Sequence, residues 1–292
     1  MSRPLRLAVL GPSGIGRIHI RLLHELGAEV TAVLSSSRES AERTASELNL
    51  TPHWDLDSLL TEDLDAITIC TPPARHFEEI VAAFDRDLAV FCEKPLCDAK
   101  HVNERLAQLA AHPNRRLFIN TSNPVLVDAV ADQLPNPQAA KRFAFRFYTP
   151  GHYQGQDIAM DLLPHGLSVL LRIFGERPLS DFAWQPTDQA CPCQFHYGDC
   201  AVEFDFREDP AGPRHLSFSL DEKNFERVQE GQGVTYRVYM RSSQTGERWD
   251  SPDPFRVYLS RFLEFCRNGG DDAFPTAAAN MKLMAQCIAE GG

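Results

Sequence analysis

Short apolar runs and amphipathic stretches alternate through the first 120 residues. The apolar runs, which are typical of strands, are Leu5–Leu10, Glu29–Leu34, Ala66–Cys70, Leu88–Cys92 and Leu117–Ile119. The segments with helical spacing between them are Ile15–Leu26, Arg38–Leu48, His76–Phe84 and Ala99–Ala111. Buried parallel strands are continuously apolar, and strands that alternate with helices indicate βαβ units. The pattern predicts a doubly wound α/β domain over residues 1–120.

From residue 121 the apolar period changes to two, which is typical of strands with two different faces. The alternating segments are Arg142–Tyr148, Cys193–Tyr197, Ala201–Phe206, His215–Leu220 and Val234–Met240. Helical patterns occupy Ile158–Phe174, Phe255–Cys266 and Ala277–Ala289. Residues 121–292 are therefore expected to form an α+β domain with a large open, mostly antiparallel sheet. Pro164 should bend or begin the first of these helices, because proline disrupts a helix interior.

Composition narrows the functional classes. A chain of 292 residues suggests about two domains. The net charge of −11 argues against a nucleic-acid or anionic-membrane partner, since phosphate binding needs a basic surface. Eight cysteines are too sparse for a disulfide framework. There is neither an apolar signal region nor a span of about 20 apolar residues. We therefore expect a cytoplasmic protein with reduced thiols.

A glycine-rich turn joins the first strand to the first helix. It has the sequence Gly11-Pro12-Ser13-Gly14-Ile15-Gly16, in which Gly11 and Gly16 match the outer glycines of the G-x-G-x-x-G dinucleotide fingerprint. Ser13 stands in place of the second glycine. The free N–H groups of a helix N-terminus bind phosphate, so we expect this turn, including Ile15, to contact a dinucleotide. The alternative interpretation is a tight strand–helix turn without a ligand.

The end of the second strand bears on the choice of cofactor. NAD-binding domains place an acidic residue there, and NADP-binding domains place an arginine or small polar groups. Here the residues are Ser35, Ser36, Ser37 and Arg38, with no acid before Glu39. Three hydroxyls and a guanidinium suit a 2′-phosphate, so the sequence favours NADP over NAD. The alternative is a serine helix cap beside a solvated arginine.

The fourth strand ends in Glu93-Lys94-Pro95. Ligands of open α/β sheets bind beyond the carboxyl ends of the strands, so Lys94 should face the cofactor crevice. Pro95 restricts the backbone of Lys94 and thereby fixes the position of the ammonium group. A lysine in this place is otherwise a solvated surface charge.

Three blocks in this order resemble the Gfo/Idh/MocA family, the glucose–fructose and inositol dehydrogenase-like oxidoreductases. The blocks are Gly11–His19, Thr71–His76 and Glu93–Pro95. The resemblance implies a Rossmann dinucleotide-binding domain followed by a domain for substrate binding and oligomerisation, joined as a homodimer or homotetramer through its sheet. It also implies that the cofactor contacts extend to Thr71, Pro72, His76, Glu93, Lys94 and Asn120.

The family also carries an aspartate and a histidine four residues apart at the start of the long helix, which correspond to Asp161 and His165. Residues at i and i+4 share one helix face. The resemblance implies hydride transfer between a sugar- or cyclitol-like alcohol and nicotinamide. His165 would be the acid–base, Lys94 would stabilise charge on the reacting oxygen, and Asp161 would bind a second hydroxyl or orient the others. The alternative for the pair is a surface ion pair.

Two regions depart from the family pattern, so the substrate stays open. Residues 120–124 keep only Asn120, and residues 148–156 lack the usual glycine pair. His152 and Tyr153 are ordinary loop residues or substrate contacts. An imine or enone reductase on the same scaffold and a non-catalytic NADP-binding regulator remain as alternatives. No metal is expected, because the ligand types grouped at positions 191–200 do not share one strand parity.

Overall fold

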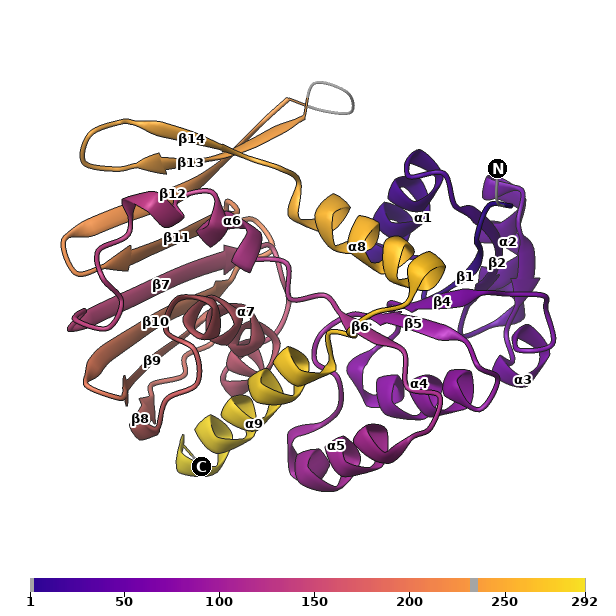
Figure 1. Ribbon diagram of the computed structural model, residues 1–292, viewed down its shortest axis with the longest axis horizontal. Helices are drawn as coiled ribbons and strands as arrows, with labels where there is room; N and C mark the ends of the chain where they lie inside the picture. The colour runs from indigo at the N-terminus through magenta and orange to yellow at the C-terminus, as the bar shows by residue number, and fades with distance from the viewer. Residues whose placement is uncertain (1–2, 232–235, 292) are drawn as a thin grey trace. The chain divides into compact units, whose positions relative to one another are not determined.

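The apolar runs of the first half of the chain form a six-stranded parallel sheet. The computed structural model describes residues 3–231 and 236–291, and its first sheet has the order β3-β2-β1-β4-β5-β6 (Figure 1). The strands are β1 (Arg6–Leu10), β2 (Glu29–Leu34), β3 (Thr51–His53), β4 (Ala66–Ile69), β5 (Ala89–Cys92) and β6 (Leu117–Ile119). The order reverses beside β1, so the carboxyl ends of β1 and β4 flank the crevice where ligands of such sheets bind.

Helices cover both faces of this sheet. They are α1 (Ile15–Glu25), α2 (Arg38–Leu48), α3 (Leu56–Leu59), α4 (His76–Phe84) and α5 (Val102–Ala111), with short 3₁₀ turns at Pro73–Arg75 and Ala99–His101. In Figure 1, α4 and α5 lie on the opposite face from α8 (Pro254–Asn268). The strand β3 and the helix α3 were not predicted, because each is too short to show a period.

The helix α8 belongs to this first unit, although it comes from the end of the chain. The described residues up to Asn120 form one compact unit together with Phe255–Met281, and Thr121–Pro254 form the other with the residues from Lys282 on. The Phe262 ring of α8 lies 5.5 Å from that of Phe91 and 5.8 Å from that of Phe118. The first unit thus ends at Asn120 before the chain enters the second, and Phe255–Met281, which were expected in the second domain, group with the first unit. A helical pattern does not say which sheet the helix covers.

The second unit is built on an eight-stranded sheet with the order β14-β13-β12-β11-β7-β10-β9-β8. Its strands are β7 (Arg142–Thr149), β8 (Leu179–Trp184), β9 (Ala190–Tyr197), β10 (Cys200–Glu208), β11 (His215–Leu220), β12 (Lys223–Glu230), β13 (Arg237–Ser242) and β14 (Arg248–Ser251). Only β7 and β10 pair in parallel. The predicted class, a Rossmann domain followed by a mostly antiparallel α+β domain, is confirmed. Of the predicted strand Val234–Met240, residues 234 and 235 lie outside the described residues.

A long helix, α7 (Gln156–Phe174), packs on the inner face of this sheet. A Cβ added at Gly166 would lie 2.9 Å from the Phe204 ring, so glycine allows the close approach of helix and sheet. The helix begins at Gln156 and contains Pro164 in its interior, so of the two expected effects of the proline, bending or beginning the helix, the second is excluded. The remaining helices are α6 (Pro124–Asp128), α9 (Phe274–Gly291) and the 3₁₀ turn Ala131–Gln133. No helix in the described part of the chain is long and apolar enough to cross a membrane.

Candidate active site

The glycine-rich turn is tightly packed at the two positions that match the fingerprint. Gly11 has a φ of 76°, and a Cβ there would lie 2.5 Å from the Cys70 carbonyl oxygen. A Cβ at Gly16 would lie 2.2 Å from the carbonyl oxygen of Gly11. Any side chain at either position would therefore displace backbone, since real Cβ atoms do not come this close. The packing of β1, β4 and α1 requires both glycines independently of any ligand.

A cavity of about 330 Å³ lies beside this turn, at the carboxyl ends of β1, β2 and β4. Of the residues predicted to bind the cofactor, its lining includes Gly11, Ser13, Ser35, Ser36, Thr71 and Pro72. The lining also contains three arginines that were not predicted, Arg17, Arg43 and Arg75. Guanidinium groups, hydroxyls and a helix N-terminus together suit the phosphates of a dinucleotide.

Arg43 reaches this cavity from the second turn of α2. Ser40, Arg43 and Thr44 all line it, and their i, i+3, i+4 spacing places them on one helix face. Helical spacing counted from Ser40, and not from Arg38, leads to Arg43 and Thr44. Since Ser35 and Ser36 contribute hydroxyls to the same cavity, it holds the residue types that suit a phosphate.

Two of the predicted cofactor contacts have other roles in α2 and do not line the cavity. The Ser37 hydroxyl accepts a hydrogen bond from the backbone N–H of Ser40 (3.3 Å) and thereby caps the helix. Arg38 pairs with Glu42 (2.7 Å), and its guanidinium lies 5.1 Å from the centroid of the Trp54 ring. Gly14, Ile15 and Gly16 form the helix start and are not part of the cavity lining either.

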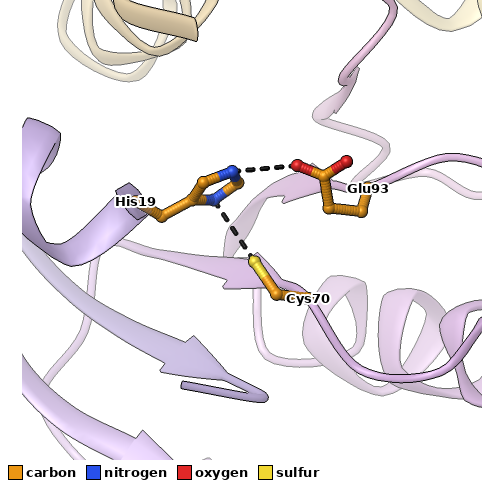
Figure 2. A group of neighbouring side chains, drawn as sticks. All are labelled: His19, Cys70 and Glu93. Carbon is orange, nitrogen blue, oxygen red and sulfur yellow. Dashed lines mark hydrogen bonds and ion pairs between the residues drawn. The ribbon is translucent and has the colours of Figure 1, made fainter. Parts of the chain in front are cut away.

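A hydrogen-bonded chain of side chains lies beneath the Glu93-Lys94-Pro95 turn (Figure 2). His19 Nε2 lies 2.9 Å from Glu93 Oε1, and His19 Nδ1 lies 3.3 Å from Cys70 Sγ. The amide of Asn120 donates to the same Glu93 oxygen at 2.7 Å. The two partners contact different ring nitrogens of His19, as in a hydrogen-bonded chain, and the ligand atoms of His19, Cys70 and Glu93 all lie within 4.8 Å of one another. The chain ties the end of β5 to α1 and β6.

The pKa values of two members of this chain are shifted, in opposite directions. Burial opposes ionisation of Glu93, but the hydrogen bonds from His19 and Asn120 and the charge of Lys94 bring its pKa below the ordinary value. Burial and the Glu93 charge raise the pKa of the Cys70 thiol well above its usual range. Glu93 is therefore held as a carboxylate and Cys70 as a thiol, which makes Cys70 a donor and not a nucleophile.

His76 fixes the other side of the same turn. Its ring nitrogens lie 2.7 Å from the carbonyl oxygen of Pro95 and 2.8 Å from that of Thr71. Burial lowers the pKa of His76, although both carbonyl groups favour the protonated ring. Lys94 stands between Glu93 and the cis-bonded Pro95, so both neighbours of the lysine are anchored. His76, Glu93 and Asn120 thus lie outside the cavity lining and act on the turns around it.

In the second unit, the predicted acid–base His165 lies on α7 above the end of β7. Its ring centroid is 4.8 Å from that of Phe147, edge to face. The side-chain amide of Asn123 lies 3.3 Å from His165 Nδ1. If the amide donates there, the neutral ring carries its proton on Nε2. Asn123 was not predicted, although it lies in the stretch that departs from the family pattern.

The loop before α7 is hydrogen-bonded to the buried carboxylate of Glu208. Glu208 Oε2 accepts a hydrogen bond from the backbone N–H of Tyr153 (2.8 Å), and a Cβ at Gly151 would lie 1.9 Å from the same oxygen. Burial raises the pKa of Tyr153, and the charge of Asp161 raises it further. Asp161 and Tyr153 are therefore neighbours, which keeps Tyr153 among the candidate substrate contacts.

The grouped cysteines of the second unit lie in its core. Cys191, Cys193 and Cys200 are all buried, so the parity argument separated residues that share the inner face of the sheet. Cys200 pairs with Tyr197, however, while Cys191 pairs with Phe206 at the far end of the same two strands. His196 faces the other side, 3.3 Å from Asp181.

Comparison with known proteins agrees with this arrangement. Residues 5–121 match the model of the GFO_IDH_MocA oxidoreductase family, which has an NAD-binding Rossmann fold. The inositol 2-dehydrogenase of Streptomyces avermitilis is 36% identical over 121 residues, 40% of this chain and 35% of that protein. The inositol 2-dehydrogenase of Mycolicibacterium gilvum is 29% identical over 195 residues, which are 63% of this chain and 56% of that protein. The matched segments thus span about a third to just over half the length of these relatives.

Solved structures extend the likeness in fold to the whole chain. A 3-ketoreductase from Actinomadura kijaniata, in complex with NADP, has a TM-score of 0.79 at 17% identity and covers 99% of this chain and 98% of its own. The myo-inositol 2-dehydrogenase of Lactobacillus plantarum has a TM-score of 0.76 at 17% identity, with 98% and 97% covered. The fold is therefore that of these enzymes over both units, and residues 5–121 match the Gfo/Idh/MocA family of NAD-binding Rossmann-fold oxidoreductases.

Proposed function

We propose that the chain is an NADP-preferring oxidoreductase that transfers a hydride between nicotinamide and a sugar, cyclitol or related hydroxy or keto compound. The observation that carries the proposal is the cavity at the glycine-rich turn, which Arg43, Ser35 and Ser36 line where an NAD-binding domain would place a carboxylate. The relatives reported above are named inositol 2-dehydrogenases, and the structure of the 3-ketoreductase was solved in complex with NADP.

Arg43 is assigned to the 2′-phosphate in place of Arg38. The guanidinium of Arg38 is occupied by Glu42 and Trp54, whereas Arg43 lines the cavity together with Ser40 and Thr44. A guanidinium binds phosphate through two parallel hydrogen bonds, and a carboxylate in this place would repel it. The Gly11–Gly16 turn and the start of α1 are assigned to the diphosphate.

NADPH is expected to bind at least ~10-fold more tightly than NADH, a difference of about 1.4 kcal/mol. Arg43→Ala should remove most of this difference, because it deletes the charge that only the 2′-phosphate uses. Arg38→Ala is the matched control in the same helix and should leave the ratio unchanged. Fluorescence titration of both nucleotides measures the ratio. Equal affinities in the unmutated protein would refute the NADP preference without affecting the fold.

The proton-transfer chemistry is assigned to three side chains. The bound nicotinamide supplies or accepts the hydride. His165, with Nδ1 held by Asn123, donates or accepts the hydroxyl proton through Nε2. Lys94, fixed by the anchored residues on either side, stabilises negative charge on the reacting oxygen. Asp161 orients a neighbouring hydroxyl or the other two groups.

The chain is further expected to form a homodimer or homotetramer through the outer face of its eight-stranded sheet. On this face charges of both signs stand side by side, for example Arg146, which pairs in register with Asp205. A surface that carries both signs can pair with a second copy of itself about a two-fold axis. Light scattering at micromolar concentration should give a multiple of 32.7 kDa. A monomer mass would contradict the proposal.

We also assign the protein to the cytoplasm. All eight cysteines are free, Cys191 and Cys193 among them. Free thiols in a chain with this many cysteines agree with a reducing compartment.

A further inference from the structure

The inner, mostly apolar face of the eight-stranded sheet carries a basic side chain, Arg227, besides the buried carboxylate of Glu208. Arg227 follows Phe225 by two residues in β12, so both side chains point to the same face. Phe225 is buried there, and its ring lies 5.7 Å from that of Trp249. Arg227 pairs in register with Met240 of β13, which is fully buried. The aliphatic part of the Arg227 side chain therefore lies among apolar neighbours, and Arg227 as a whole is only partly exposed.

Within the described part of the chain, no carboxylate forms an ion pair or hydrogen bond with Arg227. Burial lowers the pKa of Arg227, and the charge of Arg214 lowers it further, while Tyr236 acts in the opposite direction. A partly buried charge without a counter-charge reduces the stability of the folded state. A second cation nearby increases this cost. The stability of the fold therefore gives no reason for an arginine at this position, whereas an anionic ligand would.

The position of Arg227 relative to His165 follows from the strand register. His165 packs on Phe147 of β7, and Phe147 pairs with Leu216 of β11. Ser217 pairs with Glu226, so Arg227 stands one step further along β12, beside Leu216. Neighbouring strands are about 4.8 Å apart. The backbone of Arg227 is thus two strands, or about 10 Å, from that of Phe147 on the same face.

We propose that Arg227 binds an anionic group of the substrate, so that the substrate is a sugar-like compound carrying a phosphate or a carboxylate and not a neutral polyol. This inference rests on the proposed function, because it takes His165 as the reacting end of the site. Two strand spacings, about 10 Å between the backbones, bring the long Arg227 side chain within reach of one end of a hexose-sized substrate whose other end reacts at His165. The guanidinium offers two parallel hydrogen bonds to either anion, and Arg214 adds positive charge to the same region.

The test compares neutral and acidic compounds with one carbon skeleton. Binding of glucose, glucuronate and glucose 6-phosphate to the NADP-saturated protein is measured by calorimetry, and turnover of each is followed by nicotinamide absorbance. At least one of the two anions should bind about 10-fold or more tightly than glucose, the usual worth of a hydrogen-bonded charge. Arg227→Gln should abolish this preference and leave the affinity for glucose unchanged. The two acidic compounds distinguish carboxylate from phosphate.

Two further variants control for folding and for general charge. Arg146→Gln removes the same charge from an exposed residue of β7, whose alternation places it on the opposite face, and it should keep the preference. Arg227→Lys should retain part of it. The melting temperature of Arg227→Gln should be unchanged or a few degrees higher, since it removes a partly buried charge that has no counter-charge among the described residues. A merely structural arginine would instead lower the melting temperature.

The outcomes separate this inference from the proposed function. Two results would overturn the inference: turnover of glucose with no preference for either anion, or equal anion binding by the unmutated protein and Arg227→Gln. Turnover of glucose would still support the proposed oxidoreductase activity. Arg227-dependent anion binding without turnover of any compound supports the anion site and counts against the oxidoreductase. If the protein shows neither turnover nor charge-dependent binding, both the inference and the proposed function are contradicted.

Discussion

His165→Ala is expected to lower turnover about 10²- to 10⁴-fold, the usual worth of a general acid–base, with the affinity for NADPH nearly unchanged. The reason is that the cofactor is assigned to the cavity at the Gly11–Gly16 turn and Arg43, whereas His165 is assigned only to the proton of the reacting hydroxyl. With Nδ1 held by the Asn123 amide at 3.3 Å, Nε2 is the nitrogen that exchanges this proton. Steady-state kinetics and fluorescence titration of NADPH measure the two effects separately.

His196→Ala is the control for this variant. It removes an imidazole from the same unit, but one that is exposed beside Asp181 on the outer face of the sheet. Its turnover should be that of the unmutated protein. Near-normal turnover in His165→Ala would remove histidine from the mechanism and would move the proton transfer to Lys94.

Lys94→Ala is expected to lower turnover at least as much as His165→Ala, because it removes a positive charge aimed at the developing oxyanion. The turn itself should survive, since its anchors are the Glu93 carboxylate and the contact between His76 and the Pro95 carbonyl. The melting temperature should therefore stay close to that of the unmutated protein.

Lys94→Arg and Lys100→Ala complete the comparison. Arginine keeps the charge but spreads it over a planar group, so Lys94→Arg should recover only part of the lost turnover. Lys100 is exposed in the same unit, and its replacement should change neither turnover nor cofactor affinity. Full turnover in Lys94→Ala, together with a normal His165→Ala, would show that the family resemblance misplaces the reacting groups.

The buried parallel sheet could be predicted from sequence because its strands are short, apolar and separated by helices. The strand β12 could not, since Lys223–Glu230 is mostly polar and lies toward the edge of its sheet. The helix α8 was predicted as a helix, but its place in the first unit depends on contacts such as Phe262 with Phe91. Local periodicity carries no information about such distant partners.

The candidate site shows the same contrast between residues that local sequence patterns identify and residues that only the folded chain brings together. Gly11, Ser35 and Thr71, which were predicted to bind the cofactor, line the cavity, because each lies just beyond the end of a parallel strand. Arg43 was missed, since it enters the cavity from a helix face and not from a strand end. The contact between His19 and Glu93 was also missed, because it joins residues 74 positions apart in the chain.

Hydride transfer by the unmutated chain tests the proposed oxidoreductase activity most directly. NADPH is mixed with keto-sugars, keto-inositols, imines and enones, and the loss of nicotinamide absorbance is followed with NADH in parallel. We predict that at least one keto-sugar or keto-inositol causes oxidation of the nicotinamide cofactor. This oxidation should be faster with NADPH than with NADH. Tight NADPH binding without oxidation by any compound would instead indicate a non-catalytic regulator, and oxidation by imines or enones alone would contradict the assignment to carbonyl and hydroxyl chemistry.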